Sequence, residues 1–394
     1  MLVKKVVIDR ANRLFKMPPD ILSFASLVPK RGLIRRPDLL DLATFAWPVE
    51  FDDDVVIKGE RLRPASRSEI DGLKEEILAW MQTHAQARLT STKEVYVGGG
   101  ITHMLLALSL AYIDNGDLAF VPELGVPMYR KAIIAAGGEP VTYGISQKRG
   151  WSPDFSRVGS RVGHVARILF LNSPHNPTGG ELTPKDLGEL IWQAGKENLL
   201  IVNDAAYQSI AGRAPVSTLA VEGGRRVAVE LYSLSYQFGL PHLPFGFAVG
   251  NREVIAGLEV ASGLLPVTIP SWVVEMAHRA IRQYPNAAIK SVRQQCAQTS
   301  AEASRLLELL SLETVGGAAV PFIWCRIQRR AHAGTLARLL YRRYRILVAP
   351  GTSFGETGQG YIRMSLTRDA KTYGDAAARI KRRLDLLHGR KGEA

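Results

Sequence analysis

Cysteine and long apolar runs are scarce in this sequence. The 394 residues include only 2 cysteines, Cys296 and Cys325, which lie far apart and outside any metal-ligand spacing. This scarcity excludes a disulfide scaffold, predicts no metal site and indicates a reducing, cytoplasmic compartment. The longest apolar stretch, Ile101–Ile113, is interrupted by His103 and is too short to span a bilayer. The first residues have only a short apolar run between charges, so we expect no secretory signal and no membrane partner.

Acidic residues are outnumbered by basic ones. The sequence has 37 Asp and Glu against 50 Lys and Arg, which leaves a formal net charge of +13. The surplus is spread along the chain, with small clusters at Lys30–Arg36 and Lys381–Lys391. No aromatic residues are interleaved with these clusters, so the sequence does not predict a nucleic-acid partner. The charge favours acidic partners in general, and an acidic carrier protein is one hypothesis.

The hydrophobic pattern predicts an α/β protein with two domains. A chain of this length, 46% hydrophobic and 22% charged, is too long for one small core. Strand-like and helix-like runs alternate from Leu118 to Val249, which is typical of a mostly parallel sheet covered by helices on both faces. From about Pro266 the pattern changes to long amphipathic helices and a final α+β segment. We expect a large domain at 50–270, and an N-terminal arm and small domain at 1–49 and 271–394.

The individual elements follow from the same periodicities. The expected strands are 95–97, 118–122, 139–143, 167–172, 199–203, 227–233, 245–249, 319–326 and 345–348. The expected helices are 68–81, a long apolar helix after His103, 129–136, 184–196, 272–282, 287–310 and 373–387. Gly98–Gly100 lies between a strand and a helix, where free amides and the helix dipole favour an anion. A plain strand-to-helix turn is the alternative at that position.

Four stretches resemble the class I/II aminotransferases. They are Asn172–Gly179 (Asn-Ser-Pro-His-Asn-Pro-Thr-Gly), Val202–Tyr207 (Val-Asn-Asp-Ala-Ala-Tyr), Leu231–Gly250 and Gly360–Leu366 (Gly-Tyr-Ile-Arg-Met-Ser-Leu). Together, in order and spacing, they are far more specific than any one of them. The sequence resembles the diaminopimelate and aspartate aminotransferases, which are pyridoxal-phosphate (PLP) enzymes of fold type I. That resemblance implies a mostly parallel, seven-stranded type of sheet and a smaller α+β domain.

The resemblance also implies roles for individual residues. Asn176 and Tyr207 match the pair that binds the cofactor's ring oxygen, and Asp204 matches the partner of its pyridine nitrogen. Arg363 matches the arginine that clamps a substrate carboxylate, so Arg363 and Asn176 are candidate substrate-binding residues. Each residue also has a structural alternative, as a loop residue, a strand cap or a member of an ion pair. The remaining positions of the cofactor site are Ile101, Thr102, Val126, Ser233, Ser235 and Pro244.

Several positions depart from the family pattern. Tyr236 stands where the family has the lysine that forms an imine with the cofactor, and a phenol cannot form an imine. No lysine occurs between Lys196 and Lys290. Pro244 replaces the arginine that holds the phosphate, and Val126 replaces the ring that stacks on the pyridine. Without that lysine we expect no covalently bound PLP. Since charged hydrogen bonds contribute about 1.5–3 kcal/mol each, we also expect the protein not to retain PLP tightly.

The N-terminal part resembles segments that contact a second subunit. Residues 8–18 are similar to an arm that packs on the partner, which implies a homodimer. Arg63–Pro64 falls where a tyrosine of the second subunit reaches the phosphate. Asp41–Pro48 stands where the family has Asp-Leu-Gly-x-Gly-x-Pro, and without these glycines we expect the loop to close differently.

Three functions are compatible with this mixture. The first is an aminotransferase-fold enzyme with a lysine-independent reaction on a small carboxylate or amino-acid-derived substrate. The second binds PLP or pyridoxamine phosphate (PMP) noncovalently and preserves transamination or a dehydration. The third is a non-catalytic partner subunit. Tyr236 and His242 are the candidate catalytic residues of the first hypothesis; alternatively, Tyr236 fills space and His242 is an ordinary loop residue.

Overall fold

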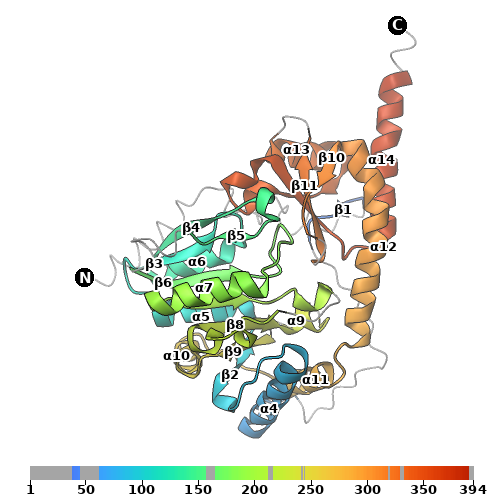
Figure 1. Ribbon diagram of the computed structural model, residues 1–394. Helices are drawn as coiled ribbons and strands as arrows, with labels where there is room; N and C mark the ends of the chain where they lie inside the picture. Colours follow the sequence, from blue (N-terminus) through green and yellow to red (C-terminus); the bar gives the residue numbers. More distant parts are fainter. Residues whose placement is uncertain are drawn as a thin grey trace, which may run out of the picture.

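The computed structural model describes residues 38–44, 62–156, 165–211, 216–240, 243, 245–317, 320–328 and 332–389. The expected arm at 8–18 lies outside these residues, as do residues 45–48, His242 and Pro244. Within them, a large sheet is wrapped by helices, and a smaller sheet carries two long helices along its side (Figure 1). No helix in this part of the chain is long and apolar enough to cross a membrane.

The large sheet is mostly parallel, as predicted. Its eight strands follow the order β2-β9-β8-β7-β6-β3-β4-β5. Strands β4, β3, β6, β7 and β8 are parallel neighbours, whereas β9 runs antiparallel to both β2 and β8. The strand beyond the expected seven is the two-residue β5, which pairs antiparallel with β4. The bounds are β2 (Val95–Gly99), β3 (Leu118–Pro122), β4 (Glu139–Ile145), β5 (Pro153–Asp154), β6 (Ala166–Asn172), β7 (Leu200–Asp204), β8 (Ala228–Ser233) and β9 (Phe245–Gly250).

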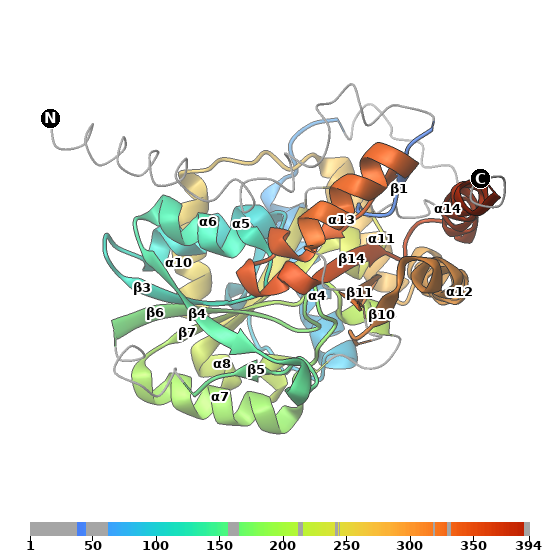
Figure 2. The same ribbon diagram turned by 90° about the horizontal axis from the view of Figure 1, so that it is seen from above.

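Helices cover both faces of this sheet (Figure 2). On one face lie α5 (Ile101–Tyr112), α6 (Pro127–Ala136) and α10 (Arg252–Gly263), whose buried residues form one apolar cluster with the sheet. The opposite face packs against α4 (Arg67–His84), α7 (Pro184–Glu197) and α11 (Ser271–Arg282). Helices α4 and α7 each begin with a capping box, which satisfies free amides of the first turn. Helix α10 was not predicted from the sequence.

The smaller domain is built on an antiparallel sheet of four strands in the order β10-β11-β14-β13. A short parallel pair, β1 with β12, attaches residues 40–41 to this domain. The boundaries proposed at residues 50 and 270 stay a prediction. The elements are β1 (Leu40–Asp41), α8 (Gly224–Val227), α9 (Leu234–Gln237), α12 (Ala287–Leu310), β10 (Leu312–Thr314), β11 (Phe322–Ile327), α13 (Ala333–Leu339), β12 (Ile346–Leu347), β13 (Ala349–Pro350), β14 (Tyr361–Ser365) and α14 (Ala370–Gly389).

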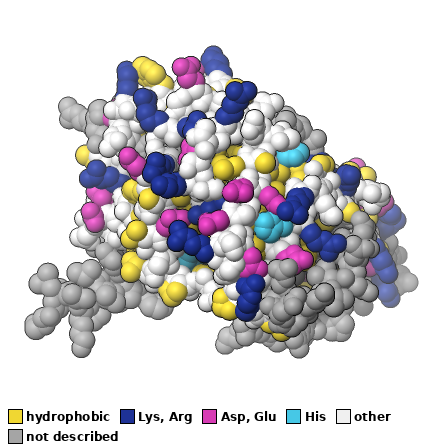
Figure 3. All heavy atoms as spheres, turned by 90° about the horizontal axis from the view of Figure 1, so that it is seen from below, with side chains coloured by type: hydrophobic (Ala, Val, Ile, Leu, Met, Phe, Trp, Pro, Cys, Tyr) yellow, Lys and Arg dark blue, Asp and Glu magenta, His cyan; other side chains and the backbone are white. Residues whose placement is uncertain are grey.

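Charges of both signs are interspersed on the face that contains α4 (Figure 3). Ion pairs on this helix include Lys74 with Glu259 at 3.0 Å, and Glu76 with Arg282, whose Nε donates to it at 2.6 Å. The basic surplus of the sequence therefore forms no continuous patch on this face.

A buried carboxylate joins the centre of the large sheet to the segment before α8. The Glu230 side chain, on β8, is fully buried. Its Oε1 accepts hydrogen bonds from the Thr218 amide at 2.7 Å and Asn203 Nδ2 at 3.0 Å. Its Oε2 accepts from Ser217 Oγ at 2.6 Å and Tyr232 Oη at 2.9 Å. Four donors therefore converge on one carboxylate, which is how a buried charge is tolerated.

This arrangement predicts a large effect of a small change. We expect Glu230→Gln to lower the free energy of unfolding by about 2–3 kcal/mol, because the new amide group faces donors that need an acceptor. Denaturant unfolding measures the difference. The matched substitution of exposed Glu222 to Gln should change it by less than about 0.5 kcal/mol. Equal effects of the two substitutions would show that the four-donor arrangement does not stabilise the fold.

Candidate functional site

The candidate residues converge at the carboxyl ends of adjacent parallel strands. β6 ends at Asn172 and β7 at Asp204, and these two residues are partners in the ladder. The neighbouring β8 ends at Ser233, directly before α9. Asn172 Nδ2 donates to the Asp204 carbonyl at 2.7 Å, and Asn172 Oδ1 accepts from the Asn176 amide at 2.7 Å. Loops that follow different strands are thereby fixed to one another, as expected at this edge of a parallel sheet.

Asp204 is a buried carboxylate with defined partners. Its Oδ2 accepts from Tyr129 Oη at 2.8 Å, and its Oδ1 accepts from the Ala206 amide at 3.2 Å. Burial raises the pKa of Asp204 to about 6, although both hydrogen bonds oppose that rise. Tyr129 is itself fully buried and stacks on Phe170, with ring centroids 5.6 Å apart. Asp204 is therefore rigidly placed, and close to the balance point between its two protonation states at neutral to slightly acidic pH.

A second chain of contacts links the two domains. Asn176 Nδ2 donates to Tyr207 Oη at 3.0 Å, and Asn176 Oδ1 accepts from Arg363 Nη1 at 2.9 Å. Arg363 lies on β14 of the smaller domain and is 5% exposed. Its guanidinium carbon lies 5.2 Å from the centre of the Phe322 ring and 4.9 Å from that of Phe354. Burial lowers the pKa of Arg363 to about 10, so it still carries its charge at neutral pH.

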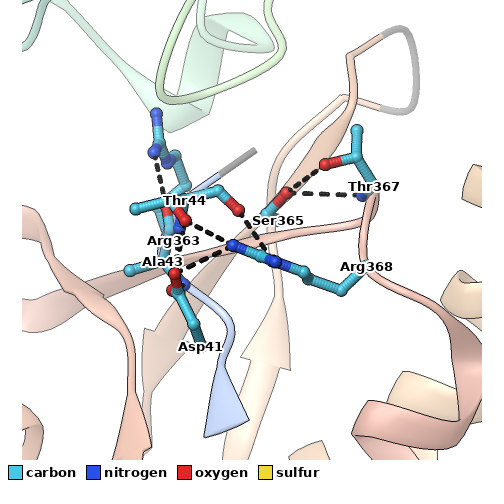
Figure 4. Close-up of polar contacts among 7 residues, drawn as sticks. All are labelled: Asp41, Ala43, Thr44, Arg363, Ser365, Thr367 and Arg368. Carbon is cyan, nitrogen blue, oxygen red and sulfur yellow. Dashed lines mark hydrogen bonds and ion pairs between the residues drawn. The ribbon is translucent and has the colours of Figure 1, made fainter. Parts of the chain in front are cut away.

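A turn at 41–44 contacts the same guanidinium (Figure 4). Arg363 Nη2 donates to the Ala43 carbonyl at 3.0 Å. The turn is held by Asp41, whose Oδ1 accepts from the amides of Ala43 at 2.9 Å and Thr44 at 3.1 Å. Arg368 adds a bond to Asp41 Oδ2 at 2.9 Å and another to Thr44 Oγ1 at 2.5 Å. Arg368 was not predicted from the sequence, and it positions the turn that positions Arg363.

Tyr236 lies on α9 and is partly buried. Its ring meets that of Tyr207 with centroids 5.4 Å apart, and it packs with Ile101 on the cluster that includes Phe322. Burial raises the pKa of the Tyr236 phenol; the charge of Arg363 opposes this rise and that of Asp204 adds to it. The phenol is therefore a neutral hydrogen-bond donor at neutral pH and a poor base.

The residues predicted to bind the cofactor phosphate offer few polar side chains directed at one point. Gly100 caps the start of α5 without a side-chain bond, Ile101 is half-buried and Thr102 is exposed. Ser235 Oγ donates to the Leu243 carbonyl at 3.0 Å, within its own loop. The buried Ser233 caps α9 without a side-chain bond. Val126 is partly buried and, like Ile101, packs against the cluster of α5, α6 and α10.

Two further residues at the site were missed. Tyr129 bonds Asp204, and His175 is a buried histidine whose Nδ1 lies 2.8 Å from Thr178 Oγ1. The sequence signals were the Pro127-Met128-Tyr129 run and the histidine inside the Asn-x-Pro-x-Asn motif. Burial lowers the pKa of His175 to about 4. No group of three or more His, Cys, Asp or Glu side chains suited to a metal ion occurs in the described part of the chain.

The shifted pKa values of Asp204 and His175 have opposite consequences. Asp204 titrates at about 6 in the folded chain and about 4 unfolded, so its contribution to stability falls as the pH rises through that window. His175 titrates at about 4 folded and about 6.5 unfolded, so its contribution rises through nearly the same window. Each slope is about 1.4 kcal/mol per pH unit, and in the wild type they nearly cancel.

Single substitutions should reveal the two slopes. We expect the unfolding free energy of Asp204→Asn to increase from pH 4 to pH 6 relative to wild type, and that of His175→Asn to decrease. The double variant should again be nearly flat. Denaturant unfolding at half-unit pH steps measures the four curves. Parallel curves for all four proteins would contradict the assigned pKa shifts.

The comparisons with known proteins agree with this arrangement. A model of the aminotransferase class I and II family matches residues 57–380. An LL-diaminopimelate aminotransferase of Syntrophobacter fumaroxidans is 29% identical over 392 residues, covering 95% of this chain and 98% of the relative. One from Dehalococcoides mccartyi is 30% identical over 300 residues, covering 75% and 76%.

Solved structures with lower identity share the fold. Substrate-bound BacF from Bacillus subtilis has a TM-score of 0.82 at 22% identity, covering 93% of this chain and 97% of that structure. N-succinyldiaminopimelate aminotransferase from Mycobacterium tuberculosis has a TM-score of 0.78 at 20% identity, covering 92% and 99%. The expected fold type I architecture is thus confirmed. By the match of the family model to most of its length, the chain belongs to the class I and II aminotransferases.

Proposed function

We propose that this chain is an enzyme that binds a small amino-acid-like carboxylate at Arg363 and acts without a covalent bond to PLP. The observation that carries the proposal is a buried, charged guanidinium beside a phenol. Arg363 is held by Asn176 and Ala43, and the Tyr236 ring lies against Tyr207, the next residue in the same chain of contacts. A planar guanidinium recognises a carboxylate through two parallel bonds.

The replacement of lysine by Tyr236 rests on the sequence pattern. Tyr236 follows Ser233-Leu-Ser235 at the end of β8, where the family pattern has its lysine, and no lysine occurs between Lys196 and Lys290. Tyr236 supplies a hydrogen-bond donor at this position and no amine. In the proposed mechanism it donates to a substrate oxygen, while Arg363 orients the carboxylate. The raised pKa of Tyr236 disfavours a role for it as a general base.

PLP is the cofactor that this family implies, and the residues present fit a noncovalent complex in part. Asp204 would hold its pyridine nitrogen, and Asn176 with Tyr207 its ring oxygen; bound there, the ring supplies an electron sink. Asp204 with a pKa of about 6 gains a cationic partner in such a complex, which favours its ionised form. The phosphate side fits less well, because Thr102 is exposed and Ser235 bonds within its loop.

The carboxylate proposal is tested at Arg363. We expect calorimetric titration with L-aspartate, L-glutamate and their 2-oxo acids to detect binding by at least one of them. Arg363→Gln should weaken it at least tenfold, since a charged hydrogen bond contributes about 1.5–3 kcal/mol. The exposed Arg305→Gln is the matched control and should leave binding unchanged. Equal affinity in both variants, or no binding of any of these ligands to the wild type, would overturn the proposal.

The role of position 236 is tested by restoring the amine. Incubation with PLP and borohydride should leave the wild type without a covalent adduct at the site, as measured by intact mass. Tyr236→Lys should acquire one adduct, mapped by peptide mass to position 236. Tyr236→Phe, which has no amine, is the control. An adduct on the wild type at another site lysine would contradict a lysine-independent reaction.

A noncovalent PLP or PMP enzyme is the second candidate, because Asp204, Asn176 and Tyr207 keep the ring-binding pattern. A non-catalytic partner subunit is the third. Gel filtration removes loosely bound PLP or PMP. Activity that is lost on gel filtration and regained when PLP or PMP is added would favour the second candidate over the first.

We also propose two partners and a location. A second copy of the chain is supported by exposed apolar side chains on α10 and just after it, namely Val260, Leu264 and Val267. An acidic carrier protein is supported by the exposed Arg342 and Arg343, which lie next to α14, since Arg379 of that helix donates to the Tyr344 carbonyl at 2.9 Å. The cytoplasmic location stays a prediction from the sequence.

A further inference from the structure

A cavity lies at the junction of the two domains. Its volume is about 550 Å³, and none of the residues proposed for the carboxylate site lines it. The large sheet contributes Leu124 and the end of β4 with the turn after it, residues 145–148. The smaller domain contributes Arg326 on β11, Thr357 and Tyr361 on β14. The cavity is therefore formed jointly by the two domains.

One wall of this cavity is a fixed aromatic corner. Trp151 meets Tyr361 edge-on with ring centroids 5.6 Å apart, and Tyr361 stacks on Trp324 at 5.0 Å. Trp151 is 4% exposed, and its indole donates to the Val315 carbonyl of the smaller domain. Its backbone has φ +66°, a conformation that bulky residues rarely adopt. Strain of this kind persists where the surrounding contacts hold a side chain in a required position.

Two cationic side chains reach the cavity from opposite domains. Lys148 comes from the turn after β4, and it forms no ion pair with any of the described residues. Arg326 pairs with Glu313 through Nη2 at 2.6 Å and Nε at 3.2 Å, and its Nη1 carries two further donors. Ser146 and Thr357 add hydroxyl groups to the lining. The lining thus combines positive charge, hydroxyl donors and ring faces in one cavity of ligand size.

We propose that this cavity binds a small organic anion with a flat ring, such as an aromatic carboxylate or an aromatic phosphate ester. The ring lies against Trp151 and Tyr361, and the anionic group contacts Lys148 and Arg326. This site is separate from the carboxylate site of the proposed function and does not depend on it. Because its walls come from both domains, the bound anion stabilises the arrangement in which the domains meet.

The cavity has a physical connection to Arg363. Tyr361 stacks on Trp324, which meets Phe354 edge-on at 6.0 Å, and Phe354 lies under the guanidinium of Arg363. The Phe354 carbonyl also accepts from the Gly125 amide at 2.9 Å, one residue from Leu124 in the cavity. A ligand that fixes the domain junction therefore fixes the ring beneath Arg363 as well.

The experiment uses full-length protein carrying Arg363→Gln, so that an anion cannot be held at Arg363. Phenyl phosphate and benzoate are titrated by calorimetry and by quenching of tryptophan fluorescence. We expect saturable binding, weakened at least fivefold by adding Lys148→Ala or Arg326→Ala. Lys185→Ala on α7, which is exposed and does not line the cavity, is the matched control and should bind as before. Cyclohexanecarboxylate and inorganic phosphate should bind at least fivefold more weakly than the aromatic anions.

Two results would overturn this proposal. One is the absence of saturable binding by either aromatic anion, and the other is binding that Lys148→Ala and Arg326→Ala leave unchanged. Binding that occurs with wild-type protein but disappears with Arg363→Gln alone would place the anion at the carboxylate site; it would refute the second site and support the proposed function. The aromatic wall is tested by Trp151→Leu and Tyr361→Leu, which should both weaken binding of the aromatic anions. If Trp151→Leu fails to fold, Tyr361→Leu alone decides, and unaltered affinity in that variant would refute the stacked ring.

Discussion

The burial of Arg363 is the interaction on which the rest of the site depends. A guanidinium at 5% exposure loses most of its hydration, and this cost is offset only by fixed acceptors and ring faces. Asn176 and the Ala43 carbonyl are those acceptors, and they come from the large sheet and from the turn at 41–44. Each of these two acceptors is itself held in place by other residues. Asn172 holds Asn176 at the end of β6, and Asp41 with Arg368 holds the turn (Figure 4). One buried charge thus determines how three segments of the chain meet.

Asp204 and His175 illustrate a second constraint, the electrostatic balance of the edge where the strands end. Both are buried, and their hydrogen bonds to Tyr129 and Ala206 for the carboxylate, and to Thr178 for the imidazole, bring no opposite charge. Burial therefore moves each pKa towards the neutral form, upwards for the acid and downwards for the base. Because the two linkages oppose one another, the summed cost of keeping these two groups neutral changes little between about pH 4 and pH 6. A cationic ligand group beside Asp204 would change this balance.

Sequence patterns located most of the fold and those site residues that belong to compact motifs. The strand ends at Asn172, Asp204 and Ser233 were predictable because alternating elements imply a parallel sheet, whose carboxyl ends meet. Helix α10 was not, because Gly257 and several small residues weaken its apolar periodicity. Arg368 was missed for a different reason. Its partners Asp41 and Thr44 are more than 300 residues away in the chain, and no local pattern encodes such a contact. The bond between Tyr129 and Asp204 is likewise a long-range contact.

The retained residues differ in how strongly they argue for a ligand. Asn172, Asn176 and Tyr207 hydrogen-bond one another or the backbone, so the fold alone gives a reason to keep them. Thr102 is exposed and Ser235 bonds within its own loop, so neither position needs a phosphate to account for its present contacts. Arg363 is different. Its hydrogen bonds to Asn176 and to the Ala43 carbonyl go to neutral acceptors, which do not by themselves call for a charged group. A carboxylate ligand does give a reason for a charged, planar guanidinium at this position, and that reason applies whether or not PLP is bound nearby.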